Sequence, residues 1–371
     1  MQVILSMRNF KGGGESKMIK KFIKRFFEFV GFFLICLVGL VITSKIFVPK
    51  WMNSDNNYEK QIVDGFYDQK RNTIDVMFVG NSDMYDGVSP MELWGMYGIA
   101  GYNYSHPSSR TWTDYYSIKM ILERQKPKYI FLGADSFFTV ERPRNGDNAK
   151  PTTSMRMSKT KVKMLMDKNI HTSIPIKISY IFPIIRFHSR YNDLTKDDFK
   201  YAFKSAYMPT KGFVITTKVK PLKNTNYMNK KKKVEKIPRK NRKYLDMIVE
   251  LCKKNNVKLV FLETPSADSW NHKRHDAVEK YAQDNDVLFF DMNYYIDEIG
   301  LDWKTDSKDG GNHLNLYGAI KVSDYIAKYI HENLEVPDRR NNKKYKNWHN
   351  EYKEYLQLRE ENLNAMAENR K

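Results

Sequence analysis

An uncharged apolar run close to the N-terminus constrains this chain more than any other feature. Residues 29–44 carry no charge, and four basic residues lie between positions 20 and 25. Lys45 can extend its amine to the lipid headgroups, so residues 26–48 supply the roughly 20 helical residues that cross a bilayer. Because positive charge before a span favours a cytoplasmic N-terminus, we expect a basic cytoplasmic segment at 1–25 and a signal anchor at 26–48.

Two other interpretations of this run fit less well. A cleaved signal peptide would need a small-x-small site after the apolar run, and none is clear. A buried core helix is less favoured, because apolar residues here cover every face. The chain after residue 48 is therefore expected outside the membrane. Met18 is a candidate start, because residues 1–17 add nothing that the anchor needs.

The charge of the chain indicates which partners it can bind, and its cysteines indicate whether a disulfide is expected. The formal net charge of +20 implies anionic surroundings, such as a membrane face or an anionic polymer. Nucleic acid is not expected, because the domain is placed outside and no recognition motif with base-stacking aromatics stands out. Cys36 lies in the apolar run, so a disulfide with Cys252 is not expected. No cofactor motif stands out.

Buried strands alternate with helical patterns after the anchor. The expected strands are Ile74–Val79, Tyr129–Leu132, Lys258–Leu262 and Val287–Phe290; the expected helices are Pro90–Ile99, Trp112–Glu123, Tyr244–Lys254, His275–Gln283 and Leu316–Ile330. This alternation predicts an α/β fold with a parallel sheet and helices on both faces. Functional residues in such sheets follow the strands, at their carboxyl ends.

Two further segments are expected to have their own structure. The second and third strands are too far apart for one crossover, so residues 141–237 form an insertion, with a short helix in 173–187 that breaks at Pro183. Residues 336–371 form a polar tail with an amphipathic helical stripe. That stripe either packs back on the domain or forms a partner or membrane surface.

Ser82 follows the first strand in "DVMFVGNSDMYDG", Asp75–Gly87. A serine in this place is most often a helix N-cap. It is a nucleophile only if a base and an orienting carboxylate reach it.

The sequence "DSKDGGNHLNLYGAIKVSDYI", Asp306–Ile326, supplies such groups. His313 lies in a glycine-rich turn before a helix, and Asp309 or Asp306 can reach its ring across that turn. His272 and His275 form an H-x-x-H pair without an evident third ligand, so we interpret them as helix-surface residues. Asp291, at a strand end, is interpreted as structural.

"GNSD" and "DGGNHLN" with the following "GA" resemble the first and last blocks of the SGNH (GDSL-like) hydrolases and acyltransferases, over roughly Asp75–Leu334. With one anchor, the chain is similar to exported cell-envelope acylation proteins, such as the teichoic acid D-alanyl transfer protein and alginate O-acetylation proteins. "ETPSADSWNHKRHDAVEKYA" and "FFDMN" resemble the intervening stretches. The resemblance implies an SGNH-type three-layer domain at 55–335 that contains the insertion.

The resemblance also implies roles for individual residues. Ser82 matches the nucleophile and His313 the base; Asp309, one residue before the usual aspartate position, is the expected orienter, with Asp306 in reserve. The second block would be "GYNYSHPSS", where Asn103 or Ser105 aids the oxyanion. The third block would be "GADS", where Asp135 replaces the usual asparagine donor. An ionised carboxylate cannot donate a hydrogen bond, so Asp135 is the main departure of this chain from the family pattern.

The function that this resemblance implies is transfer of acetyl or a similarly small acyl group to a polyhydroxyl or anionic envelope polymer, together with a membrane-bound O-acyltransferase. Two alternatives stay open. One is a carbohydrate esterase that deacylates the polymer, and the other is a non-catalytic scaffold for the membrane acyltransferase.

Overall fold

The computed structural model divides the chain into two compact units. The described residues are 12–53, 57–139, 152, 154–168, 172–223, 225–228 and 235–369, without the side chains of 12–17. The first unit comprises Met1–Lys50 and Ile181–Lys204, and the second comprises Trp51–Tyr180 and Ser205–Lys371. Parts of the expected insertion, among them 141–151 and 229–234, lie outside the described residues.

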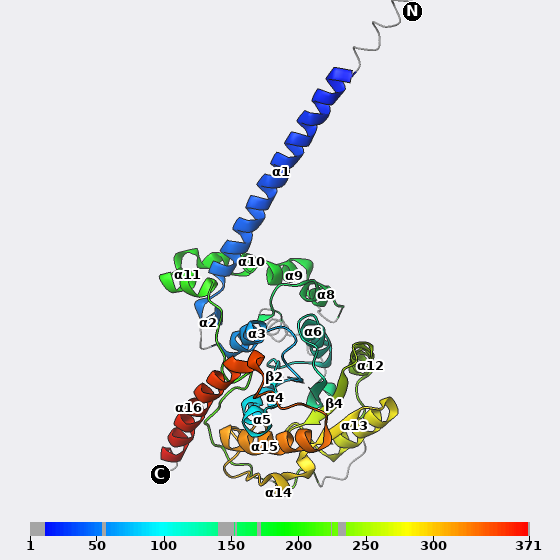
Figure 1. Cartoon of the computed structure of the whole chain (residues 1–371), viewed down its shortest axis with the longest axis vertical. Coiled ribbons are helices and arrows are strands. Elements are labelled where there is room, and N and C mark those ends of the chain that lie inside the picture. The colour runs from blue at the N-terminus through cyan, green and yellow to red at the C-terminus, as the bar shows by residue number, and fades with distance from the viewer. Residues whose placement is uncertain are drawn as a thin grey trace, which may run out of the picture. The chain divides into compact units, whose positions relative to one another are not determined.

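The first unit is built on one long helix. Helix α1 (Gly12–Phe47) is continuous (Figure 1), and its Met18–Phe47 stretch is long and apolar enough to cross a membrane. Three short elements contact it: α10 (Ile184–Phe187), the 3₁₀ helix η2 (His188–Asn192) and α11 (Lys196–Ala202). We call the segment Ile181–Lys204 the collar. Helix α9 (Ile174–Ile181) ends before Pro183, where the sequence predicts a break.

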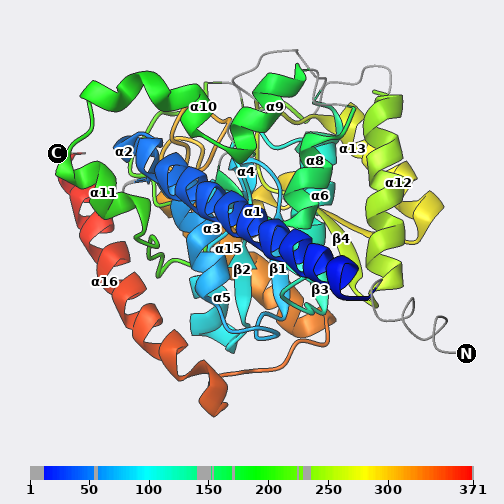
Figure 2. The ribbon, with the colours of Figure 1, turned by 90° about the horizontal axis from the view of Figure 1, so that it is seen from above.

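The second unit contains a five-stranded parallel sheet. Its strands are β1 (Val76–Val79), β2 (Gly101–Asn103), β3 (Tyr129–Gly133), β4 (Lys258–Glu263) and β5 (Leu288–Asp291). Their order is β2-β1-β3-β4-β5, and Figure 2 shows β2, β1 and β3 side by side. The four predicted strands are confirmed. Strand β2 was missed, because three residues that include glycine and asparagine carry no strand pattern.

Alternate residues of each strand enter two different cores. Met77 and Val79 of β1 pack with helices on one face, and Val76 and Phe78 pack with helices on the other. The first face is covered by α3 (Tyr58–Asp68), α6 (Thr111–Leu122), α12 (Arg239–Lys254) and α13 (His272–Asn285). The second is covered by α4 (Ser82–Gly87), α5 (Pro90–Tyr97), α14 (Ile296–Ile299) and α15 (Leu316–Asn333). The predicted α/β class with helices on both faces is therefore confirmed.

The described residues also contain several short elements. They are α2 (Lys50–Asn53), η1 (Asp135–Phe137), α8 (Lys159–Leu165), η3 (Met292–Tyr294) and η4 (Lys343–Tyr345).

The C-terminal helix α16 (Lys346–Glu368) packs back on the second unit. Its Trp348 and Tyr355 are buried in a cluster with Trp94 of α5. The Tyr355 hydroxyl donates to Glu92 at 2.6 Å, and Arg359 pairs with the same carboxylate at 3.2 Å. Of the two interpretations of the amphipathic stripe, packing on the domain is the one observed.

This packing predicts a stability effect. Tyr355→Phe leaves a buried oxygen of Glu92 without its hydroxyl donor, and should lower the free energy of unfolding by about 1–3 kcal/mol. The matched control is Tyr207→Phe, because that exposed hydroxyl also bonds a glutamate, Glu354, and should change stability by less than about 0.5 kcal/mol. Denaturant titration of the detergent-solubilised chain measures both. Equal effects of the two variants would contradict this role of α16.

Candidate active site

Ser82 is the first residue of α4, directly after β1, but it is not the cap of that helix. The N-cap is Asn81, whose side-chain oxygen accepts a hydrogen bond from the backbone N–H of Asp83 at 3.1 Å. The Ser82 Oγ instead lies 2.7 Å from Nε2 of His313. The sequence leaves two roles open for Ser82, helix cap and nucleophile. In the structure the capping role is filled by Asn81.

His313 is held by Asp309 on the side of the ring that faces away from Ser82. Asp309 Oδ2 lies 2.5 Å from Nδ1, and its Oδ1 accepts the backbone N–H of His313 at 2.8 Å. Burial acts to raise the pKa of Asp309, but these hydrogen bonds outweigh it and hold the pKa below its usual value. An ionised carboxylate at Nδ1 selects the tautomer that leaves Nε2 free to accept a proton.

The turn that carries His313 depends on two glycines. Gly310 and Gly311 have φ angles of +93° and +104°, which other residues rarely adopt. A Cβ on Gly311 would lie 2.8 Å from a methyl carbon of Leu222. Inside the turn, the Ser307 hydroxyl oxygen accepts the N–H groups of Gly310 and Gly311 at 3.1 and 2.7 Å. The turn is therefore held by contacts within the chain itself.

An extended strap, residues 211–222 of the expected insertion, holds this turn against the sheet. At one end the Lys211 carbonyl accepts the N–H of Asn103 in β2 at 2.9 Å. At the other end Lys220 exchanges backbone hydrogen bonds with the turn: its N–H donates to Ser307 at 2.9 Å, and its carbonyl accepts from Gly310 at 3.1 Å. At least this part of the insertion thus positions the candidate base.

A buried ion pair joins the same turn to α4. The Lys308 ammonium lies 2.5 Å from Asp86, whose side chain is almost completely buried. Burial raises the pKa of Asp86 to about 6, although Lys308 opposes the shift. The residue before Asp309 is therefore tied to the helix that begins at Ser82.

The site lies where the strand order of the sheet reverses. Strands β1 and β3 are neighbours, and the chain leaves them toward opposite edges, which is where doubly wound sheets bind ligands. Asn81 follows β1 and donates to Asp135, which follows β3, at 2.8 Å. Arg274 of α13 donates to the other oxygen of Asp135 at 3.0 Å. Asp135 thus accepts two hydrogen bonds here, where the resemblance predicts a donor.

Two more buried carboxyl groups lie close to His313 and Asp135. Asp83 Oδ1 is 3.7 Å from His313 Nε2, and it has no hydrogen-bond partner among the described atoms. Burial, followed by the nearby Asp135 and Asp86, raises the pKa of Asp83 well above its ordinary value. Burial and the charges of Asp135 and Asp83 act the same way on Glu263. A carboxyl group held neutral can donate a hydrogen bond, which its ionised form cannot.

The remaining candidate residues are bonded elsewhere. Asn103 donates to the backbone carbonyls of Met84 and Val88 at 2.7 and 3.1 Å, and it accepts from the hydroxyl of Ser105 at 2.6 Å. Both side chains are fully buried; Asn103 holds the backbone of α4 and its end, and Ser105 bonds Asn103. Their assistance to an oxyanion stays a prediction. The reserve residue Asp306 pairs with Lys321 of α15 at 2.7 Å, whereas Asp309 meets the imidazole.

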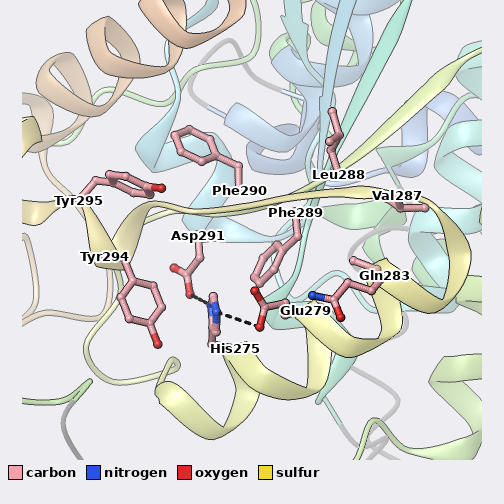
Figure 3. Close-up of a pocket in the computed structure, with 11 residues that line it drawn as sticks. His275, Glu279, Gln283, Val287, Leu288, Phe289, Phe290, Asp291, Tyr294 and Tyr295 are labelled. Atoms are coloured by element: carbon pink, nitrogen blue, oxygen red, sulfur yellow. Dashed lines mark hydrogen bonds and ion pairs between the residues drawn. The ribbon is translucent and has the colours of Figure 1, made fainter. Parts of the chain in front are cut away.

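The H-x-x-H pair belongs to a different place in the fold. His275 Nδ1 lies 2.8 Å from Asp291, in a pocket of about 430 Å³ whose lining does not include Ser82 (Figure 3). Tyr294 packs edge-on against the His275 ring, and its hydroxyl bonds to His272. Within the described part of the chain, no group of three or more His, Cys, Asp and Glu side chains is arranged to hold a metal ion.

Sequence reasoning missed the residues that support the candidate triad. Asn81 stands within the quoted "GNSD", and Arg274 within a stretch that resembles the family, so a motif signal existed for both. No sequence signal marked the strap or Ser307. The strap acts through backbone hydrogen bonds and Ser307 through one hydroxyl in a turn, and neither produces a recognisable spacing of residue types. Comparison with known proteins adds no identification: no protein-family model matches this sequence, and no curated protein matches it.

The Lys308–Asp86 pair predicts a pH dependence of stability. The pKa of Asp86 is raised in the folded protein, so its contribution to stability is present below about pH 4 and is lost as pH rises through about 6. A pKa shift of about two units corresponds to a change of about 3 kcal/mol in the free energy of unfolding across that pH range. Asp86→Asn should flatten the slope of unfolding free energy against pH between 4 and 6. Lys308→Gln should extend the slope to higher pH, because it removes the charge that opposes the shift. Unchanged slopes in both variants would contradict the assignment.

Proposed function

We propose that this protein is an extracytoplasmic, membrane-anchored O-acyltransferase of the SGNH type, with Ser82 as nucleophile, His313 as base and Asp309 as orienting carboxylate. The observation that carries the proposal is the unbroken path of contacts from the Ser82 hydroxyl through the imidazole to Asp309, at 2.7 and 2.5 Å. Both distances lie within proton-transfer and hydrogen-bond reach.

The first half of the reaction acylates the serine. The Ser82 oxygen attacks the carbonyl carbon of the acyl donor, while its proton passes to Nε2 of His313. The tetrahedral intermediate then expels the leaving group, which takes that proton from His313. The negative charge of Asp309 stabilises the imidazolium that forms between these two steps.

The second half passes the acyl group to an acceptor. A sugar or polyol hydroxyl gives its proton to His313 and attacks the ester carbonyl, and Ser82 is released with that proton restored. If water takes the place of the acceptor, the same residues hydrolyse the ester. Transfer is favoured by the similarity to envelope acylation proteins and by the N-terminal apolar helix, whereas the three residues alone fit both reactions.

Stabilisation of the oxyanion is the least regular part of this proposal. The Ser82 N–H, at the first position of α4, has no acceptor within the helix, so it can face a developing negative charge. The Asp83 N–H is taken by Asn81, and Asp135 accepts hydrogen bonds instead of donating them. This arrangement is the specific observation that favours the second candidate function, a non-catalytic scaffold for a membrane acyltransferase.

Substitutions in the candidate triad test whether the site is catalytic. Ser82→Ala should abolish acylation of the envelope polymer in cells, because no oxygen remains to carry the acyl group. Asp309→Asn should lower it about 10²- to 10⁴-fold, because the imidazole loses its orienting charge. Ser205→Ala is the control, since Ser205 is exposed and outside the site. Polymer acylation is measured by ester release at equal protein level, and acylation that persists in Ser82→Ala would favour the scaffold.

Deletion of the protein separates transfer from hydrolysis. Loss of a transferase lowers the acyl content of the polymer, and loss of an esterase raises it. A fall after deletion, together with a fall in Ser82→Ala, supports the proposed function. A rise in both would establish the esterase instead.

A further inference from the structure

We propose that the collar, Ile181–Lys204, binds the headgroup region of the bilayer at the end of α1. This inference rests on the proposal that α1 crosses a membrane, and it goes beyond the proposed function because it assigns a lipid-binding surface to a segment outside the candidate site. The collar and α1 belong to the same compact unit, so the placement of the second unit does not enter the argument.

Polar contacts fix the collar to the last turn of the apolar helix. The Arg190 guanidinium donates to the backbone carbonyl of Phe47, the last residue of α1, at 2.7 Å. The same guanidinium pairs at 2.8 Å with Asp198, which is fully buried and caps α11 through the backbone N–H of Thr195. Lys45 lies over the ring of Phe203, 5.5 Å from its centre. These contacts tie the collar to the point where the helix ends.

The exposure of α1 changes where the collar begins to cover it. Most large apolar side chains between Met18 and Ile42 are strongly exposed, as lipid-facing residues are in a structure without lipid. Two residues further on Ser44 is buried, and Val48 after it is buried too. Protein therefore replaces open surface at the end of the uncharged run 29–44, where the hydrocarbon core would give way to headgroups.

The collar itself exposes large apolar side chains at that level. Ile185, Tyr191, Phe199 and Phe203 are exposed by 45, 67, 53 and 58%. Single exposed apolar residues are ordinary on a protein surface. Four of them within 24 residues, in a unit that also carries an apolar helix, are typical of a segment that contacts a membrane. The collar also has more basic than acidic residues: Arg186, Arg190, Lys196, Lys200 and Lys204 against Asp193, Asp197 and Asp198.

These side chains suit the interface between lipid tails and headgroups. Aromatic rings and short apolar groups insert below the headgroups, and Lys and Arg attract anionic phosphates. A protein partner would also cover an apolar surface. The bilayer is favoured because the collar is bonded to the end of the helix that is proposed to cross it, so its depth is set by contacts already present. A collar bound in this way fixes how deeply the end of α1 lies in the bilayer. The chain passes between the two units at 50–51, 180–181 and 204–205.

Spin labels on single cysteines test the proposal in the full-length protein. The chain has only two cysteines: Cys36 on α1, and Cys252, which is buried and is replaced by alanine throughout. Cys36 reports on the apolar helix. Phe199→Cys and Phe203→Cys, each with Cys36→Ser, report on the collar. Leu288→Cys, also with Cys36→Ser, is the matched control, because Leu288 is as exposed as Phe199, at 53%, and belongs to the second unit.

The protein is reconstituted into phosphatidylcholine–phosphatidylglycerol vesicles, and collision rates with oxygen and with a water-soluble nickel chelate are measured. The proposal predicts that labels at 199 and 203 meet the nickel chelate several-fold less often than the label at 288, and meet oxygen more often. Shielding at Cys36 with full water exposure at 199 and 203 would overturn the collar proposal and leave the membrane span standing. Water exposure at all four positions would overturn both.

Discussion

The contact between the Ser82 hydroxyl and Nε2 of His313 is the interaction on which the rest of the site depends. The two residues are 231 positions apart in the chain, and 2.7 Å separates the Ser82 Oγ from the His313 Nε2. Nothing local brings them together. Strand β1 delivers the serine to one edge of the sheet, and a glycine turn ahead of α15 delivers the histidine to the same edge. Asp309, within that turn, needs only local geometry to reach the ring.

The fold surrounds this contact with restraints from three directions. The strap, residues 211–222, bonds the histidine turn from the side of β2, Lys308 ties the turn to α4, and Asn81 links the serine loop to Asp135 across the reversal of strand order. Such restraints are what the proposed catalytic role requires, because groups already held in position need no further ordering when a substrate binds. The same edge concentrates buried carboxyl groups, and burial raises the pKa of Asp83, Asp135 and Glu263.

Much of this arrangement could be predicted from the sequence. Four strands and five helices follow from period and turn residues. Ser82 and His313 stand out by their places after a strand and in a glycine turn, whereas the choice of Asp309 over Asp306 comes from the resemblance to the SGNH blocks. Strand β2 could not be predicted, because its three residues are held by neighbours and not by their own propensity. The collar escaped for a related reason: its contacts with α1 join segments about 140 residues apart, and no periodic pattern records such pairing. The hydrogen-bonding roles of Asn103 and Asp135 likewise depend on residues distant in the sequence, in α4, at its two ends and in α13.

The central claim is that Ser82 carries an acyl group during the reaction, and intact-protein mass spectrometry tests it most directly. The solubilised chain is mixed with an activated acetyl ester, and the reaction is quenched in acid within seconds. The mass of the intact protein is then measured, and protease digestion maps the modified peptide. The account predicts the mass of one added acetyl group, mapped to the peptide that contains Ser82, absent in Ser82→Ala and slow to form in His313→Gln. Acetylation spread over lysines alone, with equal yield in the wild type and in Ser82→Ala, would contradict it.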